Sequence, residues 1–333
     1  MTAPSSELDS HLAVDRGPDT LLTEVVSKSP MRLAVARFRK DKLSMVSLVV
    51  VVLFFLLAIS APILVAADLI DPLKNDTDLL DEYGLPLGSF GGISGDHWLG
   101  VEPGGGRDAL ARLWYGTTFS LSIAIAATII AMFIGVVAGI VSGAAGGWVD
   151  AIIGRAIDLT LAFPQTLMLL ALSAVGLAFV EEILGVPRGN PAAAVYVVGV
   201  LGLFGWTAVA RIVRGQVLSL REREFVQASQ MIGASRFRIY FREILPNLWA
   251  PILVTFTLMM PAFVSAEAAL SFLGVGISAP TPTLGNILTD ALRYADSAFL
   301  YFFFPALLIA IIVVSFNLLG DGLRDALDPK GHR

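Results

Sequence analysis

The sequence contains no cysteine and only three histidines, His11, His97 and His332, which lie far apart along the chain. The absence of cysteine excludes disulfides and thiolate chemistry, and the scattered histidines indicate no metal site. Charged residues are also scarce, at 15% of the chain against 56% hydrophobic residues. Soluble domains carry about 25% charged residues. The composition therefore predicts an integral membrane protein.

The motifs that would make the chain an enzyme are missing as well. A phosphate-binding loop needs Gly-Lys followed by Ser or Thr, so that backbone amides and the lysine hold phosphate. No Gly-Lys pair occurs in the sequence. A Gly-x-Ser-x-Gly elbow and a His-Glu-x-x-His zinc helix are also absent. We therefore expect no catalytic residue and no cofactor bound by this chain.

Six stretches without Asp, Glu, Lys or Arg are long enough to cross a membrane, for which roughly 20 apolar residues are needed. They cover 44–67, 116–149, 159–180, 191–210, 244–266 and 297–320. The first begins after a polar tail and is longer than a signal-peptide core, so we interpret it as an uncleaved transmembrane helix. The sequence predicts an all-α fold with six spans and both termini on one side.

Lys and Arg residues indicate the orientation, because they are enriched in cytoplasmic segments. With the N-terminus inside, 18 of the 23 lie in the cytoplasm and five lie outside. We therefore expect cytoplasmic N- and C-termini. The net charge of −5 is a sum over both sides of the membrane and does not indicate a nucleic-acid partner.

Two features stand out within the spans. Glycines recur every four residues at Gly135, Gly139, Gly143 and Gly147, which predicts a smooth face that a second helix can approach closely. Glu267 lies near the external end of the fifth span, where a carboxylate costs several kcal/mol unless it is paired or hydrated. It is a candidate contact in the substrate pathway or at a subunit interface; the alternative is a water-facing residue at headgroup depth.

The stretch 211–247 separates two apolar spans and contains seven arginines. Good helix formers fill 218–232, Gly233 is a natural helix stop, and Ser235 can cap a second helix. Pro246 is expected to close the stretch before the fifth span begins. The pattern predicts two helices around a sharp corner at the membrane surface, either as an amphipathic anchor in lipid or as a docking element for a partner.

This stretch resembles the cytoplasmic loop with which permease subunits of ATP-binding cassette (ABC) importers bind their ATPases. The family's motif reads Glu-Ala-Ala-x-x-x-Gly, followed further on by Leu-Pro. Gln227 and Ser229 stand where the motif has Glu and Ala, so the ion pair expected from that Glu is not carried over. The resemblance implies ATPase coupling through Glu224, Gln227, Ala228, Ser229, Gly233, Ala234, Ser235, Arg236, Tyr240, Leu245 and Pro246.

Three further segments resemble the C-type permease of the dipeptide and oligopeptide (peptide/nickel) importers. They are 97–121, with Val101 and Glu102 where Thr and Asp are usual, 267–285, and 317–329 at the C-terminus. The resemblance therefore runs from the first span to the end of the chain. It implies a type I ABC importer permease (MetI-like) fold in a bacterial or archaeal plasma (inner) membrane, surrounded by lipid.

The resemblance also implies the partners. They are a homologous B-type permease, two ATPase subunits that bind ATP and magnesium, and an extracytoplasmic substrate-binding protein that delivers a peptide. The same scaffold with a nickel chelate or glutathione as cargo stays open. A secondary transporter is a weaker alternative, because it should show repeated broken helices and membrane-embedded charges.

The chain is thus divided into a partly disordered cytoplasmic tail (1–43), a first transmembrane helix (44–67), an external loop (68–115), a five-helix permease core (116–320) with the coupling loop 211–247, and a cytoplasmic tail (321–333). The external loop is long and rich in Asp and Gly. We expect it to receive the binding protein, with Arg107, Asp108 and Arg112 as candidate contacts; the alternative is a solvated loop with a short amphipathic helix over 107–115.

Overall fold

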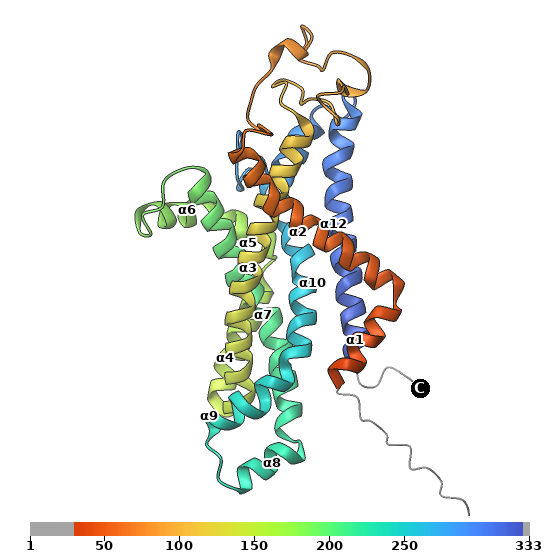
Figure 1. The fold of residues 1–333 in the computed structure, drawn as a ribbon. Coiled ribbons are helices and arrows are strands. Elements are labelled where there is room, and N and C mark those ends of the chain that lie inside the picture. Colours follow the sequence, from red (N-terminus) through yellow and green to blue (C-terminus); the bar gives the residue numbers. More distant parts are fainter. Residues whose placement is uncertain (1–29, 329–333) are drawn as a thin grey trace, which may run out of the picture.

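The computed structural model describes residues 30–328, which fold into helices joined by short connections and one long loop (Figure 1). In chain order the helices are α1 (Pro30–Lys40), α2 (Lys42–Ala66), α3 (Ala109–Ala145), α4 (Gly147–Ala162), α5 (Gln165–Ala171), α6 (Ser173–Glu182), α7 (Asn190–Arg221), α8 (Glu224–Met231), α9 (Arg236–Arg238), α10 (Leu245–Phe272), α11 (Leu284–Leu292) and α12 (Phe299–Leu327). A π-helical turn, Ile239–Ile244, joins α9 to α10, and two 3-10 turns, Thr77–Leu79 and Ser89–Gly91, lie in the long loop.

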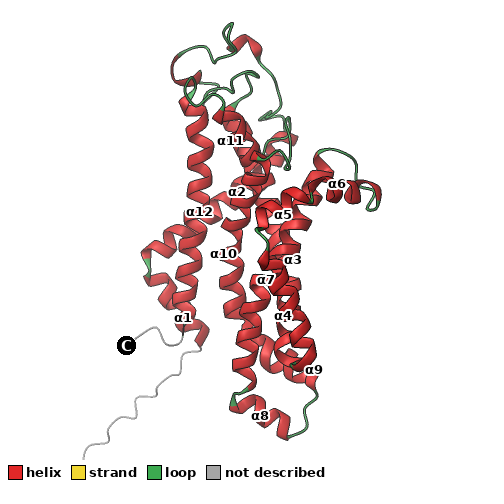
Figure 2. Cartoon of the chain, turned by 180° about the vertical axis from the view of Figure 1, so that it is seen from behind, coloured by secondary structure: helices red, strands yellow, loops and turns green. Residues whose placement is uncertain are grey.

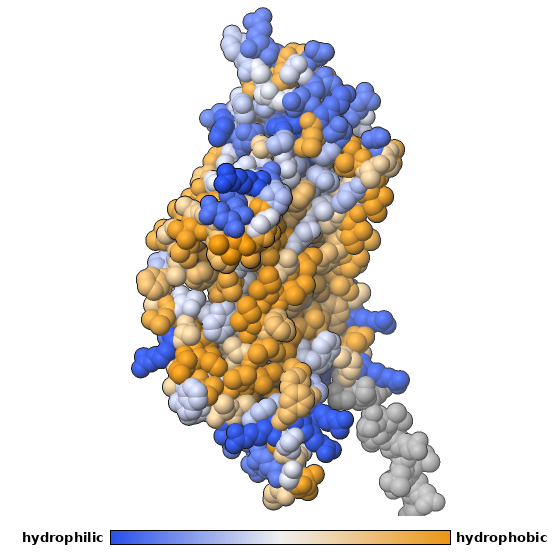
Figure 3. Space-filling view, turned by 90° about the vertical axis from the view of Figure 1, so that its left-hand side faces the viewer, coloured by the Kyte–Doolittle hydropathy of each residue, from blue (hydrophilic) through white to orange (hydrophobic). Residues whose placement is uncertain are grey.

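Five helical stretches are long and apolar enough to cross a membrane: α2, α3, α7, α12 and the continuous run Arg236–Phe272 that contains α10. Their side chains form an apolar band between two polar ends (Figure 3). We call one end the α8 end, and the other, which carries the α2–α3 loop and α11, the α11 end (Figure 2). The expectation of an all-helical membrane protein is confirmed.

The predicted third span, 159–180, does not form one straight helix. α4 and α5 together are long and apolar enough for a sixth span, but the chain bends by 83° between them. Pro164 has no N–H and disfavours helical backbone in the residue before it, and Phe163 accordingly adopts φ −98° and ψ 139°. The candidate third span is therefore a broken pair of helices that begins at Gly147, either one bent span or a re-entrant loop.

The two tails are described only in part. Of the tail predicted over 1–43, residues 1–29 lie outside the described part of the chain, and α1 occupies most of the remainder. Of the tail predicted over 321–333, residues 329–333 lie outside it, and α12 continues to Leu327.

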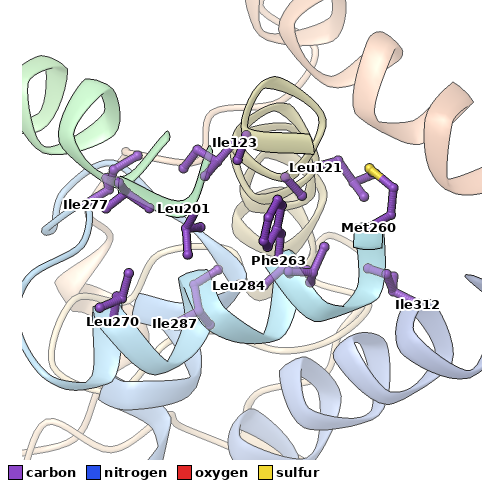
Figure 4. Close-up of a cluster of buried hydrophobic side chains, with 14 of the residues drawn as sticks. Leu121, Ile123, Leu201, Met260, Phe263, Leu270, Ile277, Leu284, Ile287 and Ile312 are labelled. Carbon is purple, nitrogen blue, oxygen red and sulfur yellow. The ribbon is translucent and has the colours of Figure 1, made fainter. Parts of the chain in front are cut away.

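The buried core consists of two clusters. The larger lies toward the α11 end and contains Leu121 of α3, Leu201 of α7, Met260 of α10 and Ile312 of α12 (Figure 4). The smaller lies toward the α8 end, and joins the second half of α7 to α3, α8 and the first turns of α10. Its buried members are Met132, Val209, Val213, Val217, Val226, Ile239, Ile244 and Leu248.

α3 packs closely against α7, and three of the four spaced glycines lie in their contact. A Cβ atom added to Gly135, Gly139 or Gly143 would lie 2.5 to 2.8 Å from the Cβ atom of a valine on α7. The valines are Val209, Val213 and Val217, spaced at the same interval as the glycines. We call this contact the glycine–valine ladder. It confirms the predicted close approach, whereas Gly147 lies outside the ladder and begins α4.

The ladder predicts opposite effects for two Gly→Ala changes. Gly139→Ala should destabilise the folded protein by about 1–3 kcal/mol, because the added methyl overpacks the contact with Val213. Gly199→Ala on α7 should instead stabilise it by about 0.5–1 kcal/mol, since a Cβ there meets no atom within 4 Å and alanine favours the helix. Thermal unfolding of both variants in detergent measures the difference; equal midpoints would contradict the ladder.

Candidate functional site

The corner predicted within 211–247 is present at the α8 end. α8 ends at Met231, Gly233 has φ +80°, and the Ser235 side chain accepts a hydrogen bond from the Arg238 N–H at 3.3 Å. Glycine adopts this left-handed backbone without strain, which explains the stop. The helix stop and the cap are therefore confirmed. The helix predicted over 218–232 is split, because α7 continues to Arg221 and α8 begins at Glu224.

From the sequence, Pro246 was expected to close the loop before the fifth span begins. In the structure it does not. It lies in the first turn of α10, and the run from Arg236 to Phe272 forms one helical span of 37 residues. Pro246 has no N–H to donate to the preceding turn, so it suits a position where the regular helical hydrogen bonding is already interrupted. The π-turn Ile239–Ile244 comes directly before it and interrupts the regular α-helical hydrogen bonding.

The loop is held to the membrane helices by an apolar underside. Val226, Ile239 and Ile244 are buried in the smaller core cluster. The Tyr240 hydroxyl donates a hydrogen bond to the Ala144 carbonyl at the end of α3, at 3.3 Å. The Arg221 guanidinium donates to the neighbouring Gly143 carbonyl at 3.2 Å. A force on the corner therefore reaches both α7 and α3.

The outer side of the corner carries exposed apolar side chains. Met231 is 83% and Ile232 is 82% exposed. Phe237 and Phe241 are also exposed, with ring centroids 4.3 Å apart. Exposed apolar patches of this kind mark sites of interaction with another protein or with a membrane. The sequence analysis did not single out Met231 and Ile232. Two apolar residues at the corner of a charged loop are a pattern that could have identified them as contact residues.

Of the eleven predicted coupling residues, seven are exposed and four are half-buried. The exposed ones are Glu224, Gln227, Ala228, Gly233, Ser235, Arg236 and Pro246. The half-buried ones are Ser229, Ala234, Tyr240 and Leu245. The amide of Gln227, which replaces the family's Glu, donates a hydrogen bond to the Glu222 carbonyl at 3.3 Å. In this position Gln227 supports the connection between α7 and α8.

The three external docking candidates are engaged within the protein. Arg112 is 2% exposed, and its Nε atom lies 2.9 Å from Oε2 of Glu102. Arg107 forms a two-pronged ion pair with the same carboxylate, with one contact of 2.6 Å. Asp108 caps α3 by accepting from the Ala111 N–H at 2.6 Å, and also contacts His97. Buried Arg112 is not available to a partner, which corrects the expectation for that residue.

The external segment does not contain the separate short helix considered over 107–115. Residues 109–115 are helical, but they form the first turns of α3, which begins at Ala109 after the Asp108 cap. Glu102 therefore ties the end of the long loop to the first turns of a membrane helix.

Glu267 is buried, at 1% exposure, and accepts hydrogen bonds from Ser120 and Ser271. The alternative of a water-facing residue at headgroup depth is therefore wrong. Across residues 30–328, no group of three or more His, Asp or Glu side chains could hold a metal ion.

Comparisons with known proteins agree with this architecture. Residues 135–332 match the family "Binding-protein-dependent transport system inner membrane component", and residues 29–81 match "N-terminal TM domain of oligopeptide transport permease C". The chain is 40% identical to the oligopeptide transport system permease protein OppC of Bacillus subtilis over 310 residues, covering 92% of this chain and 93% of the relative. It is 38% identical to the dipeptide transport system permease protein DppC of Alkalihalophilus pseudofirmus, covering 91% and 90%.

A further relative is the glutathione transport system permease protein GsiD of Shigella flexneri, with 38% identity and 88% of each chain covered. Among solved structures, an inward-facing MetNI methionine ABC transporter aligns with a TM-score of 0.53 and 18% identity, covering 66% of this chain and 97% of that chain. At that identity the alignment shows the fold alone.

The fold and these matches define a transmembrane permease subunit of an ABC importer, a multi-pass protein of the inner membrane that is not itself an enzyme. The chain belongs to the binding-protein-dependent transport system inner membrane components. Within that family it is a C-type permease, of the kind found in oligopeptide and dipeptide transporters.

The buried ion triad predicts a large loss of stability in Glu102→Gln. Removing its charge takes the nearest carboxylate away from buried Arg112, and breaking a buried ion pair costs about 3–5 kcal/mol. The exposed pair Lys74 and Asp76, 3.8 Å apart, provides the control, because Lys74→Gln should cost less than about 1 kcal/mol. Thermal unfolding and protease cleavage within 68–108 measure both. Similar stability of the two variants would contradict the triad's role.

Proposed function

We propose that this chain forms half of a translocation pathway for dipeptides or oligopeptides and couples it to cytoplasmic ATPase subunits. The observation that supports coupling most directly is the corner at Gly233, with exposed Met231 and Ile232 at its tip and an apolar underside fixed to α3 and α7. Such a tip fits a cleft of a partner, since apolar anchors in pockets supply most of the binding energy of an interface.

The remaining partners follow from the family. A homologous B-type permease would supply the other half of the pathway. Two ATPase subunits would bind ATP and magnesium and hydrolyse ATP, because this sequence has no phosphate-binding loop. An extracytoplasmic binding protein would deliver the peptide to the α11 end. The excess of Lys and Arg supports cytoplasmic N- and C-termini, and the α8 end would then face the ATPases.

Docking of the binding protein is proposed for the outer surface of the long loop. Exposed Tyr83, Phe90 and Trp98 are aromatic side chains suited to a protein contact. Glu102 and its two arginines would support this surface from beneath by holding the loop on α3.

A peptide cargo is supported by the oligopeptide and dipeptide permeases among the relatives. Glutathione is the second candidate, because a glutathione permease is 38% identical to this chain. Peptide uptake by the complex in vesicles, with glutathione and a nickel chelate as competitors, distinguishes the cargoes.

Coupling is tested at Gly233. Gly233→Val should lower peptide-stimulated ATP hydrolysis by about tenfold or more, because a β-branched residue strains the left-handed corner and displaces its tip. Gly233→Asn is the matched control, since asparagine tolerates this backbone and should retain most of the activity. The complex is purified through a tag on this chain and assayed with its partners.

Two results would contradict the proposal. One is purification of the unaltered chain from native membranes without any ATPase subunit. The other is equal ATP hydrolysis and peptide uptake by the valine and asparagine variants.

A further inference from the structure

A buried polar joint lies at the α11 end, where α3, α10 and α11 meet. The Glu267 carboxylate of α10 accepts hydrogen bonds from the hydroxyls of Ser120 on α3, at 2.8 Å, and Ser271 on α10, at 2.9 Å. The Ser120 hydroxyl accepts a third hydrogen bond from the backbone N–H of Leu284, the first residue of α11, at 3.0 Å. One carboxylate and one hydroxyl thus connect three helices.

The start of α11 suits a buried carboxylate. The first N–H groups of a helix lack partners within the helix and give its N-terminus a partial positive charge. Thr283 and Asn286 satisfy two of these donors between them by a reciprocal capping box. The Ser120 hydroxyl accepts from the N–H of Leu284 and donates its own hydrogen bond to Glu267. The helix terminus and the carboxylate therefore stabilise each other through a serine of a different helix.

The helices around this joint are tightly packed. A Cβ atom added to Gly285 of α11 would lie 2.6 Å from the Cα atom of Ala268 on α10. A Cβ atom added to Gly116 of α3 would lie 3.1 Å from Cδ1 of Ile287 on α11. Backbones in such close contact move together, since a gap would open apolar voids on both sides of α11.

The same helix that carries Ser120 is bound to the corner at the α8 end. α3 has 37 residues without a proline, so it forms an uninterrupted helix about 55 Å long. Its far end receives hydrogen bonds from Tyr240 and Arg221, and the glycine–valine ladder fixes it along α7. A displacement of the corner would therefore reach the joint through α3.

We propose that Glu267 is a positioning residue of the transport cycle, which with Ser120 locks α11 to α3 and α10 so that α11 follows the coupling corner. This rests on the proposed function and deepens it. Glu267 acts through the position of α11 and makes its contacts inside this chain.

Glu267→Gln and Ser120→Ala test the joint in the assembled complex in vesicles. Both should reduce the peptide taken up per ATP hydrolysed by about tenfold, while basal ATP hydrolysis stays within about twofold, since allosteric coupling is typically of this size. Thr117→Ala is the matched control: its buried hydroxyl lies on the same helix and donates to the Leu113 carbonyl of that helix at 2.8 Å. It should leave the ratio unchanged.

A spectroscopic measurement separates positioning from stability. The chain has no cysteine, so spin labels can be placed at Phe272→Cys and Leu292→Cys, which are both exposed. The distance distribution between them should be narrow in the parent chain and broad in the Glu267→Gln and Ser120→Ala backgrounds. Unchanged distributions, or an unchanged ratio of uptake to hydrolysis, would overturn the proposal. If the parent complex instead shows no peptide-dependent hydrolysis, the proposed function fails, and the label distances still test the joint.

Discussion

The contact between the glycine face of α3 and the valines of α7 is the interaction on which the rest of the structure depends. Lipid tails are as apolar as the helices, so burying a leucine between two spans gains little over leaving it in lipid. Close backbone approach gains more, because dispersion contacts accumulate along the whole length of the pair. The absence of a Cβ atom at Gly135, Gly139 and Gly143 makes this approach sterically possible. α3 and α7 therefore form one unit that reaches the corner at one end and the joint with α11 at the other.

Different kinds of interaction stabilise the two ends of this unit. At the α8 end, apolar residues such as Ile239 and Val226 hold the corner, and other apolar residues are left exposed. At the α11 end, buried polar groups are held by internal contacts: Glu102 pairs with two arginines, and Glu267 accepts from two serines. A buried polar group left without a partner is costly, so these contacts favour one arrangement of the chain. The α8 end therefore has apolar side chains available for contact with a partner, while the internal contacts of the α11 end resist rearrangement.

Much of this architecture could be predicted from the sequence because the relevant patterns are local. Five of the six charge-free stretches correspond to long helices, and Gly233 with Ser235 marks the corner. The remaining features depend on tertiary contacts or on a single bend. Pro164 was visible within the third span, but its 83° bend was not, because hydropathy reports length and not direction. Arg112 was expected on the surface, and its burial depends on Glu102. The Ser120 partner of Glu267 lies 147 residues away in sequence, so no local pattern reveals it.

The two helices that meet at Glu267 differ in stiffness, and this difference fits a coupled motion. α3 is free of proline, whereas α10 follows a π-turn and contains Pro251 and Pro261. Each internal proline removes one backbone hydrogen bond and permits a bend. When the corner moves, α10 can absorb part of the displacement by bending, while α3 transmits it. Because Glu267 and Ser120 hold α11 to both helices, the stiffer helix α3 sets the position of α11. The more flexible helix α10 follows.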